Sequence, residues 1–370
     1  MKDEVKMAGA AVALRSALLA MVFAVRGDDW SHYLSNCDGP SFLAVARVIY
    51  GLAPRSALKL YDSRVFPGWP LAFGWMSRFG IPDQCVLVLA VALAALVPVL
   101  FYRLTRDRTL SWYLVYFPPA WLVASAYPIS EAAYLAAILA GLLALKANRP
   151  ALAGAVGGLL VVLRAFGIAW FGGIFLGLIA GTRRIGWAAI ACALAAAVPM
   201  AGLLFLNWRL YGDVLYQLHV YGRPLVELNI PSDLAASLHN PSGHWGPPFR
   251  HLLLTPWLVH VPLWKTLYIY AHVPVVLFLA WRGCAYLLRG ARGEAWETAL
   301  VAGFLMNTAL IVCAGPYWGF ESFDRYFIWG IPGALWLARP WLGGSPRWHW
   351  ILFPVSMAMA LCSMAAHTAH

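Results

Sequence analysis

Residues 85–108 read CVLVLAVALAALVPVLFYRLTRDR, an uncharged apolar run that ends in a basic turn. A helix crosses the hydrocarbon core of a bilayer when about 20 mostly apolar residues follow one another, with about 17 as a lower limit. The run at 85–102 meets this requirement. It therefore predicts a membrane-spanning helix.

Runs of the same kind recur along the whole chain. Uncharged stretches of near-spanning length lie at 110–130, 165–182, 185–207, 298–320 and 348–366, and shorter apolar runs lie at 9–25, 132–145, 151–163, 266–281 and 326–338. The composition agrees, because 62% of the 370 residues are hydrophobic and only 12% are charged, whereas a soluble domain carries roughly a quarter charged residues. We expect an all-α, polytopic membrane protein with roughly eleven transmembrane helices, in a single domain that covers residues 1–370.

The positions of Lys and Arg orient these helices. Five short turns carry a net basic charge: YRLTRDR (102–108), KANR (146–149), TRR (182–184), WRGCAYLLRGARGE (281–294) and ARPWLGGSPRW (338–348). Cytoplasmic loops collect Lys and Arg, so the N-terminus is predicted to lie inside. The formal net charge of +11 is then explained without nucleic acid. We expect a multi-pass protein of a bacterial cytoplasmic membrane, with its first helix retained.

This orientation leaves two long segments outside, at about 27–82 and 208–255. Both are too short and too rich in aromatic residues to form soluble domains. Amphipathic helices that lie along the membrane interface are the natural interpretation, and 40–50 and 68–79 are the predicted interfacial helices of the first segment.

The first external segment combines carboxylates with a basic cluster. It contains Asp28, Asp29, Asp38 and Asp62 beside Arg47, Arg55, Lys59, Arg64 and Arg78. An acid can take a proton from an attacking hydroxyl while neighbouring cations hold a phosphate that leaves with a lipid. The alternative is an interfacial loop whose Arg residues touch lipid headgroups and whose Asp residues cap helices.

Two elements follow one another in this segment: the first contains Asp38, Gly39, Phe42, Leu43 and Ala46, and the second, Phe-Pro-x-x-Pro-Leu, contains Phe66, Pro67, Pro70 and Leu71. In this order they resemble the start of the PIG-V-like mannosyltransferases of the GT-C superfamily. Cys37 stands where the family has Trp, and the family's Gly-Tyr pair is reversed as Tyr50-Gly51. These departures concern the subfamily more than the superfamily.

Four further stretches resemble the same superfamily, in family order and on the predicted external side. They are carried by Ser130 and Glu131, by Arg164 and Gly167, by the Tyr211-Gly212-Asp213 segment with Gln217, and by Arg325, Tyr326 and Pro332. Physical chemistry singles out Glu131 and Arg164 independently, because an ionisable group at a span end is costly unless it is paired or functional. Arg325 can grip a phosphate with its guanidinium fork, or it can pair with Asp324 or Glu321.

The resemblance implies an inverting glycosyltransferase that uses a polyprenyl-phosphate sugar donor, with mannose as the expected hexose and a lipid or glycan as acceptor. It implies Asp38 as the catalytic general base and Asp28 as the second choice. Arg64, Arg164 and Arg325 would hold the lipid phosphate, and Glu131, Gln217 and Tyr326 would complete the substrate site.

No cofactor is expected, and a divalent metal is allowed but not required if Arg supplies the countercharge. The rival from another class is a lipid or sugar transporter or flippase, which would more often show inverted repeats and charges at mid-membrane depth. A non-catalytic membrane subunit is the third alternative.

Overall fold

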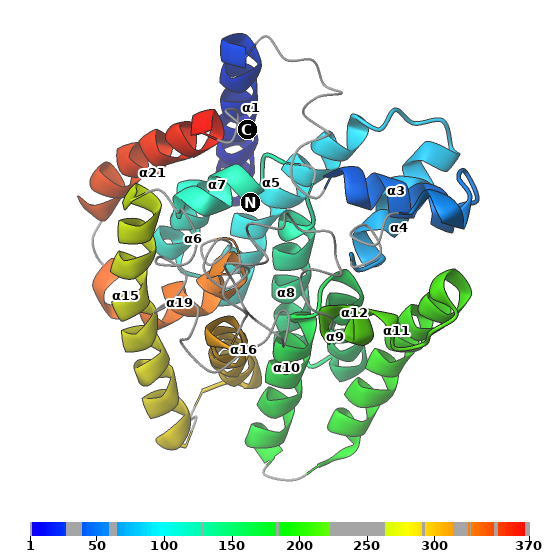
Figure 1. Cartoon of the computed structure of the whole chain (residues 1–370). Helices are drawn as coiled ribbons and strands as arrows, with labels where there is room; N and C mark the ends of the chain where they lie inside the picture. The colour runs from blue at the N-terminus through cyan, green and yellow to red at the C-terminus, as the bar shows by residue number, and fades with distance from the viewer. Residues whose placement is uncertain are drawn as a thin grey trace.

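The computed structural model describes residues 2–26, 39–58, 65–127, 129–182, 185–222, 263–290, 293–313, 325, 327–343 and 347–366. Within these ranges every regular element is a helix. Five helices are long and apolar enough to cross a membrane: α1 (Lys2–Arg26), α5 (Cys85–Thr105), α11 (Trp187–Tyr211), α15 (Leu263–Leu288) and α16 (Ala295–Val312). The chain is therefore a multi-pass helical membrane protein (Figure 1).

Further helices lie at several of the remaining predicted runs and between them. They are α8 (Glu131–Lys146), α9 (Pro150–Leu163), α10 (Gly167–Thr182), α12 (Tyr216–Gly222), α19 (Ile331–Leu337), α20 (Arg339–Leu342) and α21 (Arg347–Ala366), with 3₁₀ turns η1 (Arg55–Ala57) and η4 (Ile328–Gly330). The structure thus places helices at the predicted runs, and five of them satisfy the length and hydropathy needed for a span.

The predicted single helix over 110–130 is wrong. The structure divides it into α6 (Arg108–Tyr116) and α7 (Pro119–Ala124). The break falls at Pro118 and Pro119, because proline has no N–H to donate and its ring clashes with the preceding turn of a helix.

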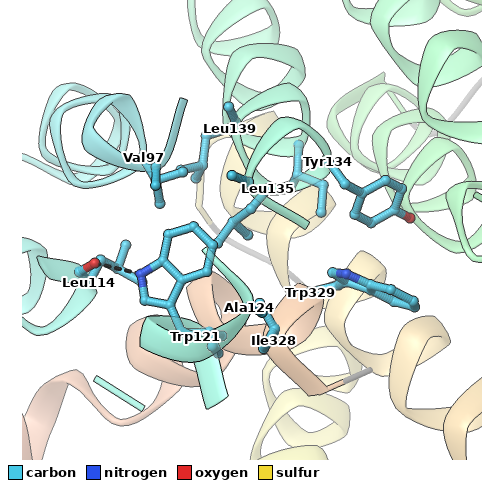
Figure 2. Close-up of a cluster of buried hydrophobic side chains, with 14 of the residues drawn as sticks. Val97, Leu114, Trp121, Ala124, Tyr134, Leu135, Leu139, Ile328 and Trp329 are labelled. Carbon is cyan, nitrogen blue, oxygen red and sulfur yellow. Dashed lines mark hydrogen bonds between the residues drawn. The ribbon is translucent and has the colours of Figure 1, made fainter. Parts of the chain in front are cut away.

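The two prolines leave two backbone carbonyls without their helical donors, and side chains replace those donors. Leu114 O accepts a hydrogen bond from Trp121 Nε1 at 2.7 Å (Figure 2). Val115 O accepts one from Arg15 Nη1 at 3.0 Å. A membrane interior provides no water for such groups, so the protein must satisfy them itself.

In the segment at 27–82, which the sequence predicts to be external, the structure has α3 (Gly39–Ile49) and α4 (Gly68–Arg78), close to the predicted helices at 40–50 and 68–79. The two helices pack together (Figure 1). Tyr50 follows α3, and its hydroxyl donates to Leu71 O at 2.9 Å. A Cβ at Gly74 would overlap the Tyr50 ring, so glycine is needed for this close contact.

Small residues bring the central helices together. A Cβ at Gly154 or Gly158 of α9 would overlap backbone carbonyls of α11, and one at Gly173 of α10 would overlap the backbone of α16. Helices in lipid associate through such close backbone approach, because lipid tails give no hydrophobic drive between them. α8 lies among these elements and packs against α5, α9, α10 and α16.

Candidate functional site

Glu131 is the first residue of α8 and is fully buried. A carboxylate in the first turn of a helix interacts favourably with the positive end of the helix dipole. That interaction is small compared with the cost of burying a charge, so Glu131 needs positively charged partners. It has two.

Arg164 is the first partner. It ends α9 with an extended backbone, and α10 begins three residues later at Gly167. A Cβ at Gly167 would overlap the carbonyl of Leu160, which explains the glycine of this Arg-x-x-Gly turn. The turn directs Arg164 to the start of α8, where its Nε donates to Ser130 Oγ at 2.8 Å and its Nη2 donates to Glu131 Oε1 at 2.7 Å.

Arg325 is the second partner. It lies just before η4, and its Nε donates to the same Glu131 Oε1 at 2.5 Å. The pairing with Asp324 or Glu321 that the sequence left open involves residues outside the described ranges. Three segments far apart in the chain therefore meet at one carboxylate oxygen, and we call Glu131, Arg164 and Arg325 the Glu131 triad.

An aromatic cluster supports the triad. The Arg164 guanidinium lies over the Trp329 ring, 5.0 Å from its centroid. Tyr134 meets Trp329 edge to face, with ring centroids 5.2 Å apart (Figure 2). The Phe166 ring, in the turn between α9 and α10, has its centroid 4.9 Å from that of Trp329. A cation over a tryptophan face gains about 0.5–2 kcal/mol, the upper value applying when it is desolvated.

The triad carries a net charge of +1 in a poorly hydrated place. The Arg164 side chain is 15% exposed and the Arg325 side chain 24%, against 0% for Glu131. The carboxylate holds both guanidinium groups in position. Arg164 Nη1 makes no hydrogen bond to any described residue. The arrangement therefore suits an anion with several acceptor oxygens, such as a phosphate.

The Phe-Pro-x-x-Pro-Leu element lies next to this site. α4 begins against the end of α9, where a Cβ at Gly68 would approach Val162 O to 2.9 Å. Phe66 packs with Val162 and Ala165, the residue after Arg164. Two stretches that the sequence related only by family order are thus neighbours in space.

Of the other predicted site residues, only Gln217 lies in the described part of the chain. Gln217 lies on α12 and is 3% exposed, and within the described part of the chain no hydrogen bond reaches its side-chain oxygen. The catalytic candidates Asp38 and Asp28, together with Arg64 and Tyr326, lie outside the described residues.

Sequence reasoning missed the aromatic support of the triad and the buried Arg15. Tyr134 was detectable, because it stands three residues after Glu131 and so shares its helix face. Arg15 was also detectable, as a charge inside the apolar run at 9–25. Trp329 gave no signal, since tryptophan is abundant throughout the chain.

Among the described residues, no three His, Cys, Asp or Glu side chains come together as metal ligands. Comparison with protein-family models and with curated proteins gives no match.

Proposed function

We propose that this protein is a membrane glycosyltransferase of the GT-C type, which moves a hexose from a polyprenyl-phosphate donor to an extracytoplasmic hydroxyl. Mannose is the hexose that the resemblance favours. The observation that carries the proposal is the Glu131 triad. Its two arginines are held beside one buried carboxylate, and two guanidinium groups fixed side by side suit the phosphate of a lipid donor.

The proposed reaction is a single inverting displacement. The acceptor oxygen forms a bond to the anomeric carbon while the bond from that carbon to the phosphate oxygen breaks. Asp38 takes the proton of the acceptor hydroxyl, with Asp28 as the second candidate. Arg164 and Arg325, with Arg64 as a third candidate, stabilise the charge that develops on the departing lipid phosphate.

Glu131 has a further role in this proposal. Its Oε2 atom is buried, and none of the described residues donates a hydrogen bond to it. In this proposal a hydroxyl of the sugar donates to Oε2, which becomes accessible when the donor binds, while Oε1 stays with the arginines. Gln217 and Tyr326 are proposed to contact the donor or acceptor, on the strength of the family resemblance alone.

The proposed topology has about eleven spans, with α6 and α7 together forming one of them and the N-terminus inside. Under this topology α8 begins, and α9 ends, at the outer surface, which places the triad on the extracytoplasmic side. The positions of helix ends support it. α10 ends, α11 begins and α15 ends at the same edge of the molecule in Figure 1, and these ends adjoin predicted cytoplasmic turns.

The test is transfer and donor binding with the purified full-length chain. A panel of polyprenyl-phosphate hexoses is offered with a mixed lipid acceptor. The double variant Arg164→Ala and Arg325→Ala (the pair) is compared with an Arg103→Ala control. The Arg103 side chain is 54% exposed and pairs with Glu4. We expect transfer from one donor and loss of donor binding in the pair only. Undiminished donor binding in the pair contradicts the proposal.

Two observations favour a transporter as the second candidate. Arg15 is buried in the middle of α1, and the α6–α7 span is broken. Intramembrane charges and interrupted helices are typical of transport pathways. Proteoliposomes that move a sugar-lipid across the bilayer without forming a new glycosidic bond would favour this candidate over the transferase.

A further inference from the structure

α15 is the most peripheral of the five spanning helices. Only 17% of its spanning window is buried, compared with 61% for α16, and it lies at the outer side of the bundle in Figure 1. Its C-terminal end carries a cavity of about 610 Å³. The cavity is lined by Trp281, Arg282, Ala285, Tyr286 and Arg289. A ligand in this cavity would therefore sit at the margin of the bundle.

The lining residues share one helix face. Arg282, Tyr286 and Arg289 are spaced by four and three residues, the spacing that places side chains above one another on a helix. The Arg282 guanidinium lies over the Trp341 ring, 4.5 Å from its centroid. This contact holds the Arg282 guanidinium at the cavity. The guanidinium N–H groups point outward in the plane of the guanidinium, so they can still donate hydrogen bonds.

The two arginines have no anionic partner among the described residues. Glu297 lies on the adjoining helix α16, and Tyr286 donates its hydroxyl to that carboxylate at 3.3 Å. Neither Arg282 nor Arg289 forms an ion pair within the described ranges. The cavity therefore presents two positive charges that can attract an anion.

We propose that this cavity binds the phosphate headgroup of an anionic phospholipid. Charge complementarity favours a phosphate as the bound group, because two guanidinium groups on one helix face match its acceptor oxygens. The apolar surroundings select a lipid as its source. The Trp281 side chain is 65% exposed and the Leu288 side chain is 86% exposed. An exposed tryptophan at the end of a span lies at the level of the lipid headgroups, and exposed apolar residues near it contact the acyl chains.

The position of the cavity agrees with this occupant. It adjoins the turn at 281–294, which the charge distribution predicts to be cytoplasmic, and anionic lipids attract basic residues at that surface. The site is separate from the Glu131 triad, so lipid binding there does not depend on the proposed glycosyl transfer.

The experiment measures equilibrium lipid binding to the purified full-length protein by native mass spectrometry. The probes are dioctanoyl phosphatidylglycerol, dioctanoyl phosphatidylcholine and inorganic phosphate. The variants are Arg282→Gln, Arg289→Gln and their combination, with Arg149→Gln as the matched control. Arg149 is an exposed arginine at another predicted cytoplasmic turn. Thermal unfolding of each variant establishes that it remains folded.

We expect wild type to prefer phosphatidylglycerol over phosphatidylcholine. Each substitution in the cavity should weaken phosphatidylglycerol binding about fivefold, and both together about 25-fold. Arg149→Gln should leave binding unchanged. An equal loss in Arg149→Gln would show general attraction by basic turns and overturn the proposal. So would equal affinity for the two lipids, or displacement of the lipid by millimolar inorganic phosphate.

Discussion

Substitution of Glu131 by glutamine tests the triad most directly. Glutamine keeps the size of the side chain and one acceptor oxygen, but it removes the negative charge that two arginines share. Both guanidinium groups would then stand beside a neutral amide in a site where Glu131 is fully buried. We expect the protein to be destabilised, because breaking a buried ion pair leaves uncompensated charge.

The magnitude follows from the geometry. The two donor nitrogens bind the same Oε1 atom, so they lie within about 5 Å of each other, and like charges at that separation repel by ~3 kcal/mol at an effective dielectric constant of about 20. Removal of one partner from a buried pair generally costs about 3–5 kcal/mol, which agrees. At an unfolding entropy of ~2.1 cal/mol/K per residue, a loss of this size lowers the melting temperature of this chain by about 5 °C.

The assay is thermal unfolding of purified protein in detergent, followed by tryptophan fluorescence. Glu4→Gln is the control, because Glu4 pairs with Arg103, whose side chain is 54% exposed. Such a surface pair contributes about 0–1 kcal/mol. Equal melting temperatures for the Glu131→Gln and Glu4→Gln variants would refute the reasoning. A second check is Glu131→Gln combined with Arg325→Gln, which removes the repulsion and should recover part of the loss.

Three further outcomes are expected. Asp38→Asn should reduce transfer by at least ~10²–10⁴-fold without loss of donor binding, because an amide cannot accept the proton; wild-type turnover would exclude Asp38 as the base. Cysteines introduced at Ser63 and Ser242 should react with a membrane-impermeant thiol reagent in intact cells, and protection of both would reverse the orientation. Gly167→Ala should cost about 1–3 kcal/mol, since its Cβ would overlap the backbone of Leu160, whereas Gly202→Ala, with open space around it, should be tolerated in the same melting assay.

Much of the helical framework could be predicted from the sequence. The run at 85–102 became α5 (Cys85–Thr105), and the short helices α3 and α4 begin within one residue of the predicted bounds. These predictions succeed because a membrane imposes one local requirement, apolar length with internal hydrogen bonding, on every span. The number of spans is harder, because helices such as α9, with 14 residues, fall below the length that hydropathy alone can assign.

The candidate site was predictable in its members but not in its contacts. Glu131 and Arg164 stood out because ionisable residues at span ends are costly. Their pairing was not predictable, because Glu131 lies 33 residues from Arg164 and 194 residues from Arg325. No periodicity connects positions so far apart, and only the packing of α8 against the turn between α9 and α10 brings them together.

Arg15 shows how a buried charge in a membrane can have a structural explanation. Pro118 and Pro119 remove the N–H groups that Leu114 O and Val115 O would otherwise accept from, and each bare carbonyl in lipid costs several kcal/mol. Arg15 Nη1 reaches Val115 O at 3.0 Å, and its Nε reaches Ser125 Oγ, at the end of α7, at 2.7 Å. One side chain thus binds both halves of the broken span. The break in the span and the position of Arg15 are therefore explained together, and Arg15 Nη2 is a buried atom without a hydrogen-bond partner among the described residues.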